Sequence, residues 1–285
     1  IWLGPEMPGD QRGDDALSLC YDSAPLSEEW DIVGAIKVNL RLSSDTSDGQ
    51  IAVRLNHIHP DGASTRITYG VLNLAQRNDH ALADALPIGH DIEVNFDLDH
   101  IAYRVPKGHK LRIAISNAYW PLLWPMPENS TLVITQGEIQ LPISPHGTDD
   151  ERHFPPPDAD EPWDIKQIRA SDNQRHITTD MKSGVTTLEI IDDFGAIEDQ
   201  QHGMVSGSVA REWWSIHPND PLSARGKTHW TEERSRGNWV TRTEAFAEMT
   251  CDSENFYLTA RMEAYENDTL IFEKDFSETI KRKHH

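Results

Sequence analysis

The segment "HIHPDGASTRITYG", residues 57–70, places two histidines, an aspartate and a serine close together. His57, Asp61 and Ser64 are the residue types of a hydrolytic triad, in which a histidine activates the serine and an aspartate orients the histidine. His57 and His59 lie two positions apart, so on a strand their side chains share one face and could chelate a metal ion. A β-turn that carries these residues only incidentally is the third interpretation.

The turn is the best supported of the three. Pro60 presets φ, Asp61 caps the turn, and Gly62 tolerates a positive φ. A nucleophile elbow, G-x-S-x-G, needs a second glycine so that a helix can pack behind the serine, but Arg66 stands there and a strand pattern follows. Three residues of one short hairpin also do not readily adopt triad geometry, which needs separate elements to converge. The sequence therefore predicts no catalytic residue in this segment.

The remaining polar groups give no stronger site. His57 and His59 are weak metal candidates, because no third ligand is fixed by the sequence, and we expect no bound metal and no cofactor. Cys20 lies in the apparent strand "LSLCYDS" and is expected to be a small buried apolar side chain. Neighbouring acids lack EF-hand spacing, and most are expected to be solvated. These acidic pairs are Asp14–Asp15, Asp149–Asp150 and Asp192–Asp193.

Large aromatic side chains are concentrated in "NAYWPLLWPMPEN", residues 117–129. Three prolines prevent this segment from being a central strand. Tyr119, Trp120 and Trp124 must therefore be buried from a stiff loop, either against their own domain or against a partner or ligand. Both outcomes remain open, and these three residues are the candidates for an interface or a substrate cleft.

Short strands separated by turns make up residues 17–143. In "VGAIKVNLRLSSD" apolar residues alternate with polar ones at period two, which is typical of a half-buried strand. Many short strands at this spacing predict a jelly-roll β-sandwich over residues 1–143. Further strands are predicted for "LSLCYDS", "IAVRLNHI", "RITYGVLNL", "HDIEVNFDLD", "HIAYRV", "KLRIAIS" and "STLVITQ".

A linker rich in proline and acid, residues 144–163, is expected to end this first domain. Longer alternating strands joined by short turns follow in residues 164–285, for example "ENFYLTARMEAY" and "TLIFEKDFSETI". This pattern predicts a second, antiparallel domain with an up-and-down meander that curls into a half-barrel. The fold class expected for the whole chain is all-β.

Composition excludes several classes of partner. The chain has 285 residues and a formal net charge of −21, so it repels phosphate backbones and anionic lipid. No apolar run approaches the length of a membrane span. Two distant cysteines form no disulfide framework, which favours a cytoplasmic location. The first ten residues are not of signal-peptide type and lack a starting methionine, so we expect part of a longer protein.

Several segments, taken in order, resemble one known family. They are "GPEMPGDQRGDDALSLCYDSAPL", "VGAIKVNLRLSSD", "RLNHIHPDGASTRITYGVLNL", "PKGHKLRIAIS" and "YWPLLWP". This succession is similar to the C-terminal region of CocE/NonD-family serine hydrolases, relatives of X-prolyl dipeptidyl peptidases and cocaine esterase. The resemblance covers residues 1–143. It implies a jelly-roll, galactose-binding-like sandwich that follows an α/β-hydrolase domain, and residues 164–285 resemble an extra β-domain of some longer members.

The resemblance implies that the Ser–Asp–His triad lies in the α/β-hydrolase domain, which this sequence does not contain. The chain alone is then expected to be inactive, to have that domain as its partner, and to help wall its substrate cleft. Parent substrates would be esters, amides or X-Pro peptides. The alternative is an independent binding module, for example a carbohydrate-binding sandwich that stacks sugars on Trp120 and Trp124. Self-association of the chain also remains open.

Overall fold

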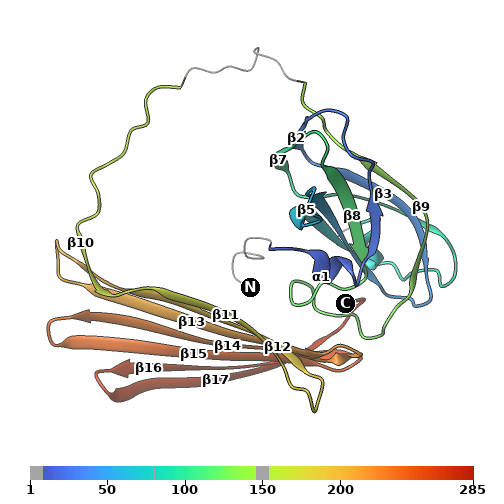
Figure 1. Cartoon of the computed structure of the whole chain (residues 1–285). Coiled ribbons are helices and arrows are strands. Elements are labelled where there is room, and N and C mark those ends of the chain that lie inside the picture. Colours follow the sequence, from blue (N-terminus) through green and yellow to red (C-terminus); the bar gives the residue numbers. More distant parts are fainter. Residues whose placement is uncertain (1–8, 80, 146–153) are drawn as a thin grey trace. The chain divides into compact units, whose positions relative to one another are not determined.

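The computed structural model describes residues 9–79, 81–145 and 154–285. The chain divides into two compact units, Ile1–His153 with Lys283–His285, and Phe154–Arg282 (Figure 1). Nearly all regular structure in both units is β-strand, and every strand pair is antiparallel, so the predicted all-β class is confirmed. Within the described ranges, no helix combines the length and apolarity needed to cross a membrane.

The first unit is built from two main sheets that share one core. Apolar side chains of both sheets meet in that core, among them Leu42, Val53, Val94 and Ile115. One sheet has the order β1-β8-β4-β5 and the other β6-β3-β9, while β2 pairs with β7. The bounds are α1 Arg12–Asp15, β1 Leu19–Asp22, β2 Trp30–Gly34, β3 Lys37–Ser44, β4 Gln50–Ile58, β5 Ser64–Asn73, η1 Leu74–Gln76, β6 Ile92–Asp97, β7 Ile101–Val105, β8 Lys110–Ser116 and β9 Leu132–Gln140.

Strands β3 and β4 show how the sequence pattern becomes layers. In β3, Val38, Leu40 and Leu42 point into the core, and the residues between them face outward. In β4 every residue is buried, including polar residues such as Arg54. One face of β4 lies in the sandwich core, and its other face is covered by the segment around α1. Residues 11–18 are therefore packed onto the outer face of β4.

The second unit is one eight-stranded meander. Its order is β10-β12-β13-β14-β15-β16-β17, and β11 also pairs with β12. β12 is bulged between Asp193 and Ala196, where Gly195 has a φ of +76°, and β10 and β11 pair with its two halves. The bounds are β10 Ile165–Arg169, β11 Asp172–Thr179, β12 Thr186–Asp199, β13 Val205–His217, β14 Asp220–Arg236, β15 Trp239–Cys251, β16 Asn255–Glu266 and β17 Thr269–Lys281. Residues 154–164, before β10, adopt no helix or strand.

The meander stays open, because β17 pairs only with β16 among the described strands. β17 is exposed along its whole length. Its apolar side chains Leu270, Phe272, Phe276 and Ile280 alternate as predicted, but each is between 43% and 51% exposed. The predicted meander is thus formed without a second layer over this strand.

Candidate functional site

Residues 57–70 contain a tight hairpin end between β4 and β5. The amide of His59 donates to the carbonyl of Ala63 (2.9 Å), and the amide of Ala63 donates to Oδ1 of Asp61 (3.0 Å). Gly62 has a φ of +88°, which an L side chain rarely adopts. The turn therefore forms for the reasons that the sequence indicated.

The three residues of the suspected triad point to different partners. Ser64 is fully buried, and its hydroxyl donates to Oδ2 of Asp15 (2.7 Å). Asp61 caps the turn, and the ring nitrogens of His57 lie against Tyr103 and His109. A buried serine whose hydroxyl proton is held by a carboxylate is not available to attack a carbonyl. This described hairpin does not assemble a hydrolytic triad.

His57 instead belongs to a histidine cluster that also contains His59 and His109. Nε2 of His57 lies 2.6 Å from Nδ1 of His109, and Nδ1 of His57 lies 2.9 Å from the hydroxyl of Tyr103. The rings of His57 and His59 stack at 4.0 Å between centroids. One ring nitrogen from each of the three histidines lies within 4.8 Å of the other two. The cluster therefore brings a third imidazole, that of His109, beside the two that the sequence singled out.

The three histidines differ in their access to water. His57 is only 3% exposed, whereas His59 and His109 are half-buried. Burial, together with the neighbouring His59 and His109, lowers the pKa of His57 to about 4. His57 is thus held as a neutral imidazole, with one ring nitrogen against Tyr103 and the other facing His109.

A second polar group, which we call the Asp15 clamp, joins the N-terminal segment to the outer face of β4. It consists of Asp15, Arg54, Asn56, Ser64 and Arg112. Oδ1 of Asp15 accepts from Nδ2 of Asn56 (2.9 Å) and lies 3.1 Å from Nη2 of Arg54. Oδ2 accepts from the Ser64 hydroxyl (2.7 Å) and from Nη1 of Arg112 (3.2 Å). A carboxylate with four donors is well stabilised as a buried anion.

Arg54 is the buried cation of this clamp, and only 2% of it is exposed. Its guanidinium also donates to Oε1 of Gln11 (2.8 Å) and to the hydroxyl of Ser18 (3.0 Å), so it binds both ends of the segment around α1. The expectation that paired acids are mostly solvated is wrong for Asp15, while Asp14 beside it is exposed. Asp15 is buried because it pairs with Arg54. Arg54 lies 39 positions away, and the local sequence does not show that the two side chains meet.

The aromatic loop, residues 117–129, lies partly against its own sandwich. The hydroxyl of Tyr119 accepts from Nη1 of Arg66 (2.7 Å), and its ring packs edge-on against Tyr69. Trp120 and Trp124 pack against each other at 5.3 Å with an interplanar angle of 76°. All three predicted interface residues, Tyr119, Trp120 and Trp124, are half-buried. The loop therefore has a fixed shape and still presents ring surface to its surroundings.

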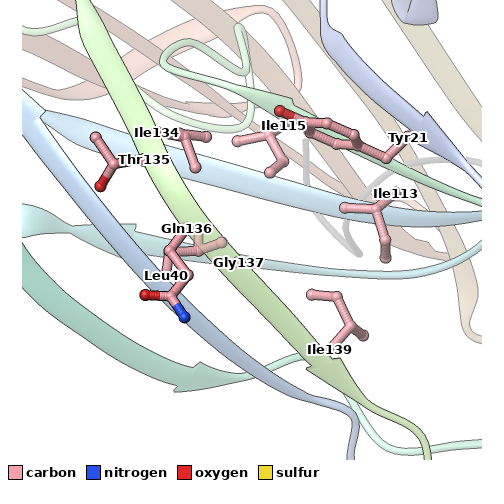
Figure 2. A pocket seen from close by; sticks show the side chains of 9 residues that line it. All are labelled: Tyr21, Leu40, Ile113, Ile115, Ile134, Thr135, Gln136, Gly137 and Ile139. Atoms are coloured by element: carbon pink, nitrogen blue, oxygen red, sulfur yellow. The ribbon is translucent and has the colours of Figure 1, made fainter.

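An apolar cleft of about 400 Å³ opens between the two main sheets of the first unit. Figure 2 shows isoleucine side chains of β8 and β9 lining it, with Tyr21 of β1 beside them. A side chain at Gly137 would meet Leu40, since an added Cβ would lie 3.0 Å from its Cδ2. The lining residues are Tyr21, Leu40, Ile113, Ile115, Ile134, Thr135, Gln136, Gly137 and Ile139.

Comparison with known proteins places these features in a family. Residues 3–185 match the family described as the X-Pro dipeptidyl-peptidase C-terminal non-catalytic domain. The chain belongs to this family. The match includes the Asp15 clamp, the histidine cluster and the aromatic loop, and it continues past the first unit to residue 185. The description of this family as non-catalytic is consistent with a hairpin in which Ser64 is buried and bonded to Asp15.

Two curated relatives bear the names of esterases. "Putative serine esterase Mb1866c" of Mycobacterium bovis is 32% identical over 126 residues, which cover 38% of this chain and 20% of that protein. "Cocaine esterase" of Rhodococcus sp. is 25% identical over 122 residues, which cover 41% of this chain and 21% of that protein. The chain thus spans about a fifth of the length of these relatives.

Solved structures give weaker similarity. An alpha-amino acid ester hydrolase has a TM-score of 0.46 and 20% identity, covering 48% of this chain and 28% of that chain. A CocE/NonD family hydrolase from Staphylococcus aureus has a TM-score of 0.35 and 13% identity, covering 39% of this chain and 24% of that chain.

Proposed function

We propose that this family member is the β-region of a CocE/NonD-type serine hydrolase, with the α/β-hydrolase domain as its partner. Three points support the proposal: the family match, the esterase names of two relatives and the construction of the Asp15 clamp. In this proposal the triad and the oxyanion hole belong to the partner domain, which would hydrolyse esters, amides or X-Pro peptides through an acyl-enzyme. The β-region would hold that domain and part of its substrate cleft in place.

The Asp15 clamp is the observation on which the supporting role rests most directly. It fixes the chain around α1 to β4 with a buried ion pair, rather than leaving a flexible lead into the sandwich. A domain joined before this segment would be tethered to a rigid point on the sandwich. Rigid tethering lowers the entropy cost of docking the two domains, so a modest interface is enough to keep them together.

The interface itself is assigned to the aromatic loop in this proposal. Large rings on a proline-stiffened loop make efficient anchors, because little conformational freedom is lost when they are covered. Tyr119 is held by Arg66, and Trp120 and Trp124 brace each other, so the loop is already ordered before a partner binds. Anchors of this type often cost about 2 kcal/mol or more when truncated.

The test uses the full-length hydrolase. Trp120→Ala is expected to raise KM and to lower the temperature at which the two domains separate, while kcat stays near the original value. Trp239→Ala, which removes an exposed tryptophan of the second unit, is the matched control and should leave KM unchanged. An unchanged KM together with unchanged thermal unfolding in Trp120→Ala would show that the loop is not the interface.

The carbohydrate-binding alternative gains no support from the loop geometry. Sugar stacking needs an aromatic face left open as a platform, whereas Trp120 and Trp124 meet edge to face. The jelly-roll topology, the division at residues 144–163 and the cytoplasmic location remain parts of the proposal. Residues 164–285 would be an accessory β-domain of the same hydrolase.

A further inference from the structure

The histidine cluster lies where two turns of the first unit meet. His57 lies near the end of β4. His59 lies in the turn between β4 and β5, and His109 lies in the turn between β7 and β8. His57 and His109 are 52 positions apart in sequence, yet one ring nitrogen from each of the three histidines lies within 4.8 Å of the other two. We propose that His57, His59 and His109 together bind one divalent transition-metal ion of zinc type, with solvent in the fourth position.

The donor set defines the class of metal. Three imidazole nitrogens suit zinc and its neighbours, whereas magnesium and calcium prefer oxygen ligands. Zinc–nitrogen bonds of about 2.0–2.1 Å in a tetrahedron place the nitrogens roughly 3.3 Å apart. The 2.6 Å pair of His57 and His109 would widen by less than about 1 Å, and the widest pair, at most 4.8 Å, would close by at most about 1.5 Å.

The two outer ligands are able to make these adjustments. His59 and His109 are half-buried and lie in turns that also contain Gly62 and Gly108, which have φ values of +88° and +84°. His57, by contrast, is buried in the sheet and gives the site a fixed point. The movement required is therefore mainly side-chain rotation of two residues at the protein surface, where solvent can complete the coordination.

Neighbouring hydroxyl groups hydrogen-bond to the rings of His57 and His59. A metal-ligating histidine commonly hydrogen-bonds through its other ring nitrogen, which fixes the tautomer and orients the ring. The Tyr103 hydroxyl does this for His57, at 2.9 Å from Nδ1, and leaves Nε2 for the metal. The Thr65 hydroxyl lies 3.1 Å from Nε2 of His59. Tyr103 is a positioning residue in this arrangement, because it acts on the metal through His57.

The bound ion would have a structural role. It would add a side-chain cross-link between the β4–β5 turn and the β7–β8 turn, beyond the backbone pairing of His57 with Leu111 and of Ile58 with Lys110 that joins β4 to β8. A cross-link between segments distant in sequence stabilises the folded state, because the ion binds only when both turns are in place. The proposal concerns these residues alone and does not depend on the function proposed for the parent hydrolase.

The experiment measures zinc binding to the full chain. The chain ends in His284–His285, a second possible binding group, so every protein tested carries His284→Ala and His285→Ala. After dialysis against a chelator, zinc is titrated in competition with a chromophoric chelator, and cobalt is added separately to record its visible d–d spectrum. One equivalent of zinc, an intense tetrahedral cobalt spectrum and a zinc-dependent rise in Tm are expected.

Variants assign the binding to the cluster. His59→Ala or His109→Ala should weaken zinc binding at least about 10-fold and abolish the Tm rise, and both residues are exposed enough for the fold to tolerate the change. Tyr103→Phe keeps the ring and should weaken binding about 10- to 100-fold. His100→Ala, an exposed histidine outside the cluster, is the matched control. The proposal is overturned if no equivalent binds, or if binding survives unchanged in the His59→Ala/His109→Ala double variant.

Discussion

The Asp15 clamp permits a quantitative prediction of stability. Asp15→Asn keeps the size of the side chain and removes its charge. It leaves Arg54, with only 2% of its surface exposed, without a buried anion. The new amide has one acceptor oxygen where Asp15 had two. If its nitrogen takes the place of Oδ2, the donors from Ser64 and Arg112 lose their acceptor.

The expected cost follows from the partners that remain. Removing one member of a buried ion pair costs about 3–5 kcal/mol, because the other charge stays buried and uncompensated. Arg54 retains Gln11 and Ser18 as neutral acceptors, and Arg112 retains Asp22, which favours the lower end of that range. We therefore expect a loss of about 3 kcal/mol. With an m-value of about 2 kcal/mol/M, the urea midpoint of the first unit should fall by roughly 1.5 M.

Hydrogen exchange of β4 peptides, followed against urea concentration, reports the first unit separately from the second. Asp14→Asn removes the neighbouring exposed charge and should change stability by less than about 0.5 kcal/mol. In an Arg54→Met background the cost of Asp15→Asn should shrink, because no buried cation is left unpaired. If Asp15→Asn and Asp14→Asn shift the midpoint equally, or if Arg54→Met leaves the cost unchanged, the clamp does not stabilise the fold as argued.

Two further predictions concern catalysis and pH. The chain alone should not turn over p-nitrophenyl acetate or an X-Pro nitroanilide, since Ser64 is buried and bonded to Asp15; turnover that Ser64→Ala abolishes would contradict this. Burial raises the pKa of Glu244, but hydrogen bonds from Thr231, His229 and Arg242 outweigh it and hold the pKa below its usual 4.5. The folded state then binds fewer protons than the unfolded state, so this stabilisation is complete above about pH 4.5 and is lost as the pH falls through the folded pKa. Urea midpoints of the second unit should fall less steeply with acid in Glu244→Gln than in the original chain, and Glu266→Gln, an exposed control, should follow the original profile.

Local patterns in the sequence predicted most of the strands. The period-two alternation in β3 and β16 and the turn residues around Gly62 act over a few positions, so they can be read without knowing what packs nearby. The order of the segments that resemble CocE/NonD-family hydrolases also predicted the family that the comparison shows. In these cases the physical cause is contained in the segment itself.

The two polar clusters depend on contacts between distant segments. The polar residues of β4, such as Arg54 and Asn56, suggest a solvated outer face, but the segment around α1 covers that face and buries them. His109 lies in a turn whose sequence gives no indication of its approach to His57. Strand order and register decide both contacts, and no local periodicity encodes them.

The open edge formed by β17 affects the behaviour of the protein in acid. An unpaired strand edge is a template on which a second chain can add a strand, and charged side chains along it keep copies apart. β17 carries Glu273, Asp275 and Glu278 among its exposed residues, within a chain of net charge −21. Near the isoelectric point, about 4.9, the net charge of the chain approaches zero, so the repulsion between copies is weakest. The exposed edge of β17 is therefore least protected against strand addition near this pH.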